Sequence, residues 1–173
     1  MILEYMGKRP KIGNKVFIAA SAIIVGDVEI MDGANIWYGT VIRGDTSYVK
    51  IGHNTNIQDN CTVHTESGNP TIIGDNVTVG HNAVVHGCTI DNRCMIGIGA
   101  IILNQAHVKS GSIIAAGSVV TVRQQLGPGI LAAGIPAVRK KELSTADYTL
   151  IDRPVQKYLK LAAEHASTKP PDT

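Results

Sequence analysis

The chain has 173 residues, of which 44% are hydrophobic, and this length suffices for one core but is short for two domains. Its 16 basic and 14 acidic residues are spread without charged blocks, which argues against a nucleic-acid partner and a membrane contact and favours small-molecule ligands. No apolar run reaches the roughly 18 residues of a membrane span, so we expect a cytoplasmic protein. The 3 cysteines lack CxxC spacing and predict neither a disulfide framework nor a thiolate metal site.

An internal repeat of six residues runs through most of the chain. A branched aliphatic residue opens each hexad, and a small residue follows it four positions later in nearly every case. This period suits a short strand followed by a tight turn, stacked as the rungs of a parallel β-helix. It also explains the 4% aromatic content, because a narrow solenoid interior has no room for large rings. The hexads open at Ile12, Ile18, Ile24, Ile30, Ile36, Ile42, Ile51, Ile57, Val63, Ile73, Val79, Val85, Ile90, Ile96, Ile102, Val108, Ile114 and Val120.

The repeat resembles that of the hexapeptide-repeat family, whose members fold as left-handed parallel β-helices with three hexads in each triangular coil. The resemblance covers roughly residues 10–126 and implies an all-β fold of about 18/3 = 6 coils. We therefore expect residues 1–126 to form the β-helix domain and residues 127–143 to close it.

A helical segment should follow over residues 144–166, with its helix packed alongside the β-helix. Asp152 is the predicted N-cap, and Pro154 is tolerated in a first turn. Residues 167–173 are polar and contain prolines, so we expect a disordered tail. The apolar stripe of the helix consists of Val155, Tyr158, Leu159 and Ala162.

Counting hexads from the first one places three polar residues in one column of the third face. These residues are Arg43, His64 and His86. Adjacent rungs lie about 4.8 Å apart, so the two imidazoles are close enough to share one metal ion. His81 falls on the second face, directly above Asp59. A third ligand from His81 would have to come from a neighbouring chain, which predicts a composite site in a cyclic trimer.

Departures from the six-residue step all fall at one corner of the predicted prism, between the third and first faces. The steps are nine residues after Ile42, ten after Val63 and five after Val85. We expect residues 45–50 and 65–71 to project there as loops, close to the histidine column, where loops on a rigid scaffold often carry function.

Four stretches of the sequence closely resemble the γ-class carbonic anhydrase family, including its short-loop bacterial members. The resemblance implies that His64, His81 and His86 bind zinc, or iron(II) or cobalt(II). It implies reversible hydration of carbon dioxide to bicarbonate by a metal-bound hydroxide, at a three-histidine site between the subunits of a homotrimer. The matching stretches are VIRGD at 41–45, NIQDN at 56–60, VH at 63–64 and VGHNAVVHGC at 79–88.

The same resemblance assigns roles to other polar residues. Gln58 would hydrogen-bond the metal-bound solvent, Asn56 would orient the substrate, and Tyr158 would lie near the metal. Glu66 is our candidate proton shuttle, and an exposed loop glutamate without such a role is the alternative. Thr46 stands where the archetypal enzyme has a glutamate, so we expect low activity. The intersubunit salt bridges would involve Arg43, Asp45 and Asp59.

Two further functions stay open at the level of the sequence. A CoA-dependent acyltransferase or thioesterase is one, because the same β-helix hosts acyltransferases that use one histidine as general base. It would need no metal and would leave three convergent histidines without a use. The other is a non-catalytic metal-binding or assembly subunit.

Overall fold

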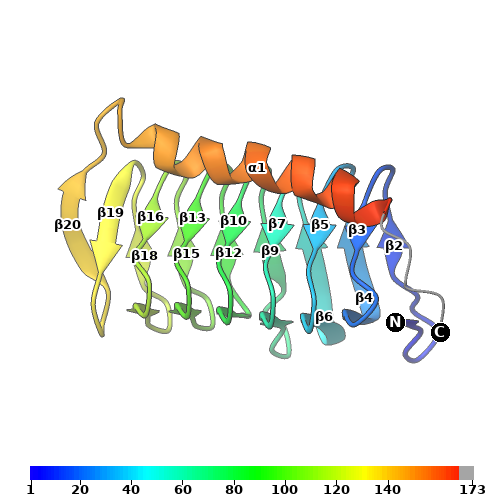
Figure 1. Ribbon diagram of the computed structural model, residues 1–173. Coiled ribbons are helices and arrows are strands. Elements are labelled where there is room, and N and C mark those ends of the chain that lie inside the picture. Colours follow the sequence, from blue (N-terminus) through cyan, green and yellow to red (C-terminus); the bar gives the residue numbers. More distant parts are fainter. Residues whose placement is uncertain (168–173) are drawn as a thin grey trace.

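A computed structural model describes residues 1–167 as a parallel β-helix with one helix along its side (Figure 1). The predicted β-helix and C-terminal helix are thus confirmed. Within residues 1–167, each of the three faces carries seven stacked strand segments, one more than the six coils predicted. The expected disordered tail lies, from residue 168 onwards, outside the described residues.

The third face consists of the strands that open the third hexad of each coil. They pair in parallel and in register, so that Ile42 lies between Ile24 and Val63, and Val63 lies beside Val85. The first strand of the chain pairs with residues 24–25 and adds one rung at the N-terminal end, before the first predicted hexad. The strands are β1 (Ile2–Leu3), the first part of β4 (Ile23–Ile30), the first part of β6 (Val41–Ile51), β8 (Thr62–His64), β11 (Val84–His86), β14 (Ile101–Ile102) and β17 (Val119–Val120).

The first face shares β4 and β6 with the third, because both strands run around the corner between the faces. The expectation of a projecting loop at residues 45–50 is therefore wrong. Residues 45–48 bulge from β6 opposite Asp27, and pairing resumes at Val49. Residues 65–71 do turn tightly between rungs. The remaining strands of the face are β2 (Lys11–Ile12), β9 (Thr71–Ile73), β12 (Thr89–Ile90), β15 (His107–Val108) and β18 (Gln125–Leu126).

The second face extends past the expected domain boundary at residue 126. β19 pairs in parallel with β16, so the repeat register continues to Ala132 inside the predicted closing segment. β20 (Val138–Glu142) then pairs antiparallel with β19. The strands of the face are β3 (Phe17–Ile18), β5 (Asn35–Ile36), β7 (Asn56–Ile57), β10 (Thr78–Val79), β13 (Met95–Ile96), β16 (Ile113–Ile114) and β19 (Ile130–Ala133).

The core is the column of branched aliphatic residues that opens the hexads. Every such residue is buried except Ile12 and Ile18, which lie in the rungs near the N-terminal end of the prism. The small residues that follow fill the corners; Ala22, Ala83 and Ala100, for example, are fully buried. Packing therefore explains why each hexad combines one branched aliphatic residue with one small residue, because the interior has room for only one large side chain per hexad.

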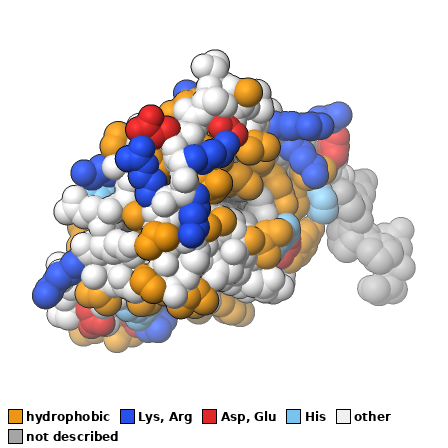
Figure 2. Space-filling model, turned by 90° about the vertical axis from the view of Figure 1, so that its left-hand side faces the viewer, with side chains coloured by type: hydrophobic (Ala, Val, Ile, Leu, Met, Phe, Trp, Pro, Cys, Tyr) orange, Lys and Arg blue, Asp and Glu red, His pale blue; other side chains and the backbone are white. Residues whose placement is uncertain are grey.

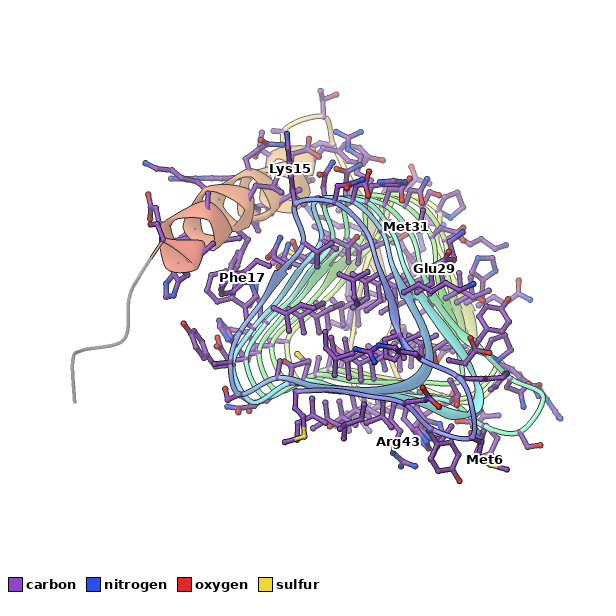
Figure 3. The ribbon with its side chains drawn as sticks, turned by 90° about the vertical axis from the view of Figure 1, so that its right-hand side faces the viewer. Met6, Lys15, Phe17, Glu29, Met31 and Arg43 are labelled. Carbon is purple, nitrogen blue, oxygen red and sulfur yellow. The ribbon has the colours of Figure 1, made fainter. Side chains whose placement is uncertain are left out.

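One helix, α1 (Tyr148–Ala166), contacts β3, β5, β7 and β10 and so covers the second face alone. Figure 3 looks along the prism, with Phe17 on the side next to the helix, Glu29 on a second side and Arg43 on the third. No helix in the described part of the chain is long and apolar enough to cross a membrane.

The start of α1 differs from the prediction. The N-cap is Asp147, not Asp152, and Pro154 lies inside the helix rather than in its first turn. The Lys141 ammonium donates to the Asp147 carboxylate at 2.8 Å, and the Ser144 amide and hydroxyl donate to it as well. These contacts lower the pKa of Asp147 to about 2. The contact with Lys141 depends on β20, which the hexad pattern does not predict. Asp152, the predicted N-cap, accepts two hydrogen bonds from Arg93.

The inner side of α1 includes part of the predicted stripe. Val155 and Ala162 are buried as expected, and Ile151, which the late predicted start excluded from the stripe, is fully buried. Replacing Ile151 with Ala should lower the free energy of unfolding by about 2–4 kcal/mol, because it leaves a cavity between helix and sheet. Chemical denaturation followed by circular dichroism would measure this. Leu150→Ala is the matched control, since Leu150 is 56% exposed; an equal loss in both variants would contradict the packing described here.

Candidate functional site

The histidine column of the third face is stacked as counted from the hexads. Arg43 pairs with His64, and His64 pairs with His86, across β6, β8 and β11. The His64 and His86 rings lie 5.0 Å apart, and His64 Nδ1 faces His86 Nε2 at 3.1 Å. Neighbouring rungs thus bring two imidazole nitrogens together with no intervening group.

His64 is held from its other side by a charged pair. Its Nε2 lies 2.8 Å from Asp45 Oδ1, and the Arg43 guanidinium donates to the second oxygen of the same carboxylate. Partial desolvation raises the pKa of Asp45, but hydrogen bonds from His64 and Arg43 outweigh it and hold the pKa below its usual value. Asp45 is therefore an ionised acceptor that requires a proton on His64 Nε2.

His86 is held by residues that the sequence analysis did not connect with it. Asn104 Oδ1 lies 2.6 Å from His86 Nδ1, and Asn104 Nδ2 donates to Glu66 Oε2 at 3.2 Å. Glu66, proposed from the sequence as a proton shuttle, thus contacts the column through Asn104. A signal for Asn104 existed, because it follows the third-face position Ile102 by two residues, one rung beyond His86.

His81 lies on the second side of the prism, above Asp59 as predicted. Its Nδ1 is 2.8 Å from Asp59 Oδ2, and its Nε2 is 3.3 Å from the Tyr158 hydroxyl. Burial raises the pKa of Tyr158, and the negative charge of Asp59 adds to the effect, so the phenol stays protonated and can donate to His81. The ring of Tyr158 packs edge-on against Trp37, with centroids 5.1 Å apart.

Gln58 and Asn56 form a buried polar chain beside His81. Gln58 Nε2 donates to Asn56 Oδ1 at 3.1 Å, and Asn56 Nδ2 donates to the Thr78 hydroxyl at 2.8 Å. Gln58 is only 5% exposed. Because its amide nitrogen is already engaged, its carbonyl oxygen is the end left to accept a hydrogen bond.

A hollow of about 800 Å³ opens beside this chain, between α1 and the second face. Its wall includes Gln58, His81 and Tyr158 together with apolar side chains such as Ile96 and Ile98. It continues toward β20, where Figure 2 shows Lys and Arg side chains interspersed with hydrophobic ones. Polar groups of three kinds therefore converge on a largely apolar cavity, as in many binding sites for small molecules.

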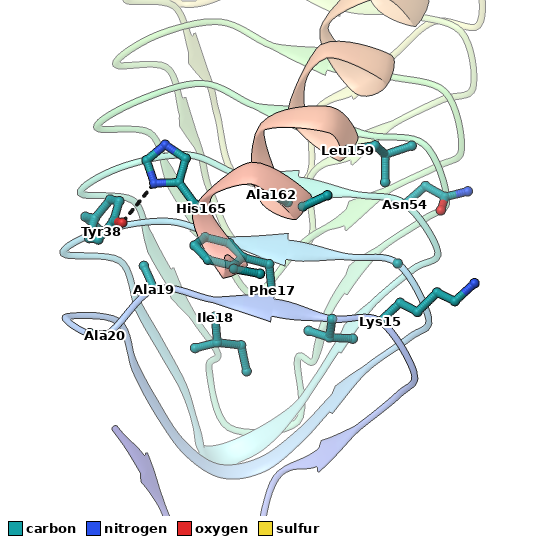
Figure 4. Close-up of a pocket in the computed structure, with 14 residues that line it drawn as sticks. Lys15, Phe17, Ile18, Ala19, Ala20, Tyr38, Asn54, Leu159, Ala162 and His165 are labelled. Atoms are coloured by element: carbon teal, nitrogen blue, oxygen red, sulfur yellow. Dashed lines mark hydrogen bonds between the residues drawn. The ribbon is translucent and has the colours of Figure 1, made fainter. Parts of the chain in front are cut away.

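A second hollow, of about 1010 Å³, lies under the other end of α1 (Figure 4). It is lined mainly by apolar residues, including Phe17 and Leu159, and its rim carries the hydrogen bond from Tyr38 to His165, 3.0 Å long. Neither His64, His81 nor His86 lines it. We therefore place the functional site at the histidines rather than at this larger hollow.

Within residues 1–167, no three His, Cys, Asp or Glu side chains gather closely enough to hold one metal ion. His64 and His86 lie on one side of the prism and His81 on another. Arg43, Asp45 and Asp59, which the sequence suggested for salt bridges between subunits, contact each other or a histidine of the same chain. Their role between subunits stays a prediction.

Comparisons with known proteins identify relatives over most of the chain. A family model described as bacterial transferase hexapeptide (six repeats) matches residues 9–44. Carbonic anhydrase of Geobacillus kaustophilus is 41% identical, over 92% of this chain and 87% of the relative. Gamma carbonic anhydrase 2, mitochondrial, of Arabidopsis thaliana is 40% identical over 96% of this chain, which spans 62% of the plant protein's length.

A solved structure with nearly the same backbone carries a different description. It is a putative acetyltransferase from Bacillus cereus, which is 40% identical, has a TM-score of 0.96 and is covered over 98% of both chains. The descriptions of these relatives thus differ in the activity they name.

Proposed function

The chain belongs to the γ-class carbonic anhydrase family of hexapeptide-repeat proteins, and from this premise we propose that it hydrates carbon dioxide reversibly at a metal site shared between two subunits of a homotrimer. His64 and His86 of one subunit and His81 of the next would be the ligands. The metal is zinc, iron(II) or cobalt(II), all of which accept imidazole nitrogen.

The observation that carries this proposal is the facing pair of nitrogens on His64 and His86. They are 3.1 Å apart. Two nitrogens bound tetrahedrally to one zinc ion at about 2.0–2.1 Å would be separated by about 3.3 Å. The pair therefore has the spacing of two ligands of one ion without rearrangement of the backbone.

The side chains that contact the three histidines fit the same chemistry. One ring nitrogen of each histidine contacts an oxygen of an Asp or Asn side chain. The partners of His64, His86 and His81 are, in that order, Asp45, Asn104 and Asp59. An oxygen acceptor draws the proton of a neutral imidazole to that nitrogen and leaves a lone pair on the other. The nitrogens on the metal side are then His64 Nδ1, His86 Nε2 and His81 Nε2. Before metal binding, the first two contact each other and the third accepts from the Tyr158 hydroxyl.

The trimer is supported by an uncovered apolar surface on the third face. Parallel sheets are normally buried on both faces, yet α1 covers only the second face. The outward column of the third face, beside the histidines, is mostly aliphatic and only half-buried. A neighbouring subunit that packs against this surface with the corner after its β10, where His81 lies beside α1, would bring its His81 toward His64 and His86. The column consists of Ile23, Val41, Thr62, Val84, Ile101 and Val119, of which Thr62 is exposed and the other five are half-buried.

When bound, the metal supplies a water molecule activated for attack on carbon dioxide. The chain's own residues would position the reactants. Gln58 would present its carbonyl oxygen as a hydrogen-bond acceptor in the cavity, and Asn56, which accepts from Gln58 Nε2, fixes the orientation of that amide. The Tyr158 hydroxyl lies 3.3 Å from His81 Nε2, on the metal side of that ring, and would be available there as a hydrogen-bond donor to the reactants. Ile96 and Ile98 give the cavity an apolar wall that suits an uncharged substrate.

Replacing His64, His81 or His86 with Ala, one at a time, should remove most of the bound metal and the hydration activity, because each change removes one of three ligands. The solenoid should stay folded, since its stability is spread over many rungs. Metal analysis, stopped-flow hydration assays and circular dichroism would measure the three effects.

His107→Ala is the matched control, because His107 also lies on a strand of the prism but pairs with Asp91 on the first face. It should keep full metal content and activity. Fully metallated wild-type protein that hydrates carbon dioxide no faster than buffer would contradict the proposed reaction, and acyl transfer from CoA would then be assayed.

Introducing charges into the aliphatic column should dissociate the trimer. The double variant Val84→Asp/Ile101→Asp would place carboxylates in a dry interface, where they find no partner, so light scattering should report monomers and metal content should fall. The control Thr89→Asp/Gln125→Asp adds the same charge to the outward column of the first face and should leave the trimer intact. A trimer that survives the first double variant with its metal would rule out this face as the interface.

A further inference from the structure

We infer that Glu66 and Asn104 are positioning residues that select the tautomer of His86, and that the turn of residues 65–71 exists to deliver Glu66 to this task. The inference rests on the proposed function, because the tautomer matters only if His86 binds a metal. The tautomer itself can be measured in the metal-free protein.

The selection follows from the two different ends of the Asn104 side chain. Glu66 is a carboxylate and can only accept, so the Asn104 NH2 group faces it, at 3.2 Å. The carbonyl oxygen of Asn104 must then face His86 Nδ1, at 2.6 Å. His86 Nε2 also faces an acceptor in the metal-free protein, because Asp45 leaves the lone pair of His64 on Nδ1. The Asn104 oxygen is nearer, at 2.6 Å against 3.1 Å, and favours the proton on His86 Nδ1, which leaves the lone pair on Nε2.

That lone pair lies where the site requires it. His86 Nε2 is the atom that faces His64 Nδ1 at 3.1 Å. If the Asn104 amide turned over, its NH2 group would donate to His86 Nδ1 and drive the proton to Nε2. The proton would then occupy the position of the metal bond.

His86 differs in this respect from the other two histidines. His64 and His81 each meet a carboxylate, Asp45 or Asp59, which accepts in either orientation. Only His86 of the three meets an amide, which has a donor end as well as an acceptor end. A second residue is therefore needed to fix the orientation of that amide, and Glu66 supplies it.

The backbone of the turn is built to hold Glu66 over the neighbouring rungs. Glu66 and Asn69 exchange backbone hydrogen bonds of 3.2 and 2.8 Å, and Gly68 between them adopts a φ of +73°, which favours glycine. A second contact fixes the far side of the turn, where Gln105 Nε2 donates to Asn69 Oδ1 at 2.9 Å. The turn between Val63 and Ile73 thus extends beyond the rung that carries His86 and contacts the rung that carries Asn104.

The test measures the tautomer and the metal affinity separately. Nitrogen-15 NMR of the metal-free protein at alkaline pH reports the protonated nitrogen of His86, and competition with a chelator reports the Kd for zinc. We expect the Nδ1–H form in the wild type and a mixture in Glu66→Ala. The zinc Kd of Glu66→Ala should rise by the inverse of the remaining Nδ1–H fraction, about twofold if half is lost.

Two further variants make the test specific. Asn104→Asp presents a carboxylate to His86, so Asn104→Asp/Glu66→Ala should recover the Nδ1–H form and the wild-type Kd. Ser67→Ala changes an exposed side chain of the same turn without touching the Glu66–Asn104–His86 chain and should change neither reading.

An unchanged tautomer in Glu66→Ala would overturn the inference, and so would an equal shift in Ser67→Ala. Failure of the double variant to recover the tautomer would overturn it as well. A wild-type protein that binds no zinc would instead contradict the proposed function, and the tautomer readings would still decide the inference.

Discussion

The in-register parallel pairing of successive rungs is the constraint on which the rest of this molecule depends. Because each rung hydrogen-bonds to the next at about 4.8 Å, a residue at a given hexad position lies directly above its equivalent one coil earlier. The core follows from this stacking, since one branched aliphatic residue per hexad builds a continuous buried column. The site follows from it too, because His64 and His86, 22 residues apart in sequence, become neighbours on adjacent rungs.

The register also decides how the site is divided. His81 lies only five residues before His86, yet it belongs to another side of the prism, where α1 and Tyr158 approach it. Within its described residues, a single chain therefore holds a pair of histidines and a separate third one, not a cluster of three. The proposed assembly makes metal binding and trimer formation interdependent: the metal would bridge two subunits, and dissociation would release it.

Much of this arrangement could be predicted from the sequence, because the hexad period fixes face and register together. The column of Arg43, His64 and His86 and the position of His81 over Asp59 needed only counting. Contacts that depend on side chains between distant rungs could not be counted in this way. The position of Asn104, one rung beyond His86, follows from the register, but its contact with His86 depends on side-chain orientation. The N-cap Asp147 depends in the same way on Lys141 of β20. The sequence predicts a loop where the structure has a bulge at residues 45–48. The nine-residue spacing between Ile42 and Ile51 does not reveal whether strand pairing continues through the corner.

Complementation between two inactive variants tests the central claim, that one site takes its ligands from two chains. A His81→Ala chain keeps His64 and His86, a His86→Ala chain keeps His81, and each homotrimer alone lacks an intact site. When equal amounts are refolded together, about three quarters of the cyclic trimers are mixed and one interface in three is complete, so metal content should recover to about a quarter of the wild-type value. Verified mixed trimers with no recovered metal would contradict the shared site.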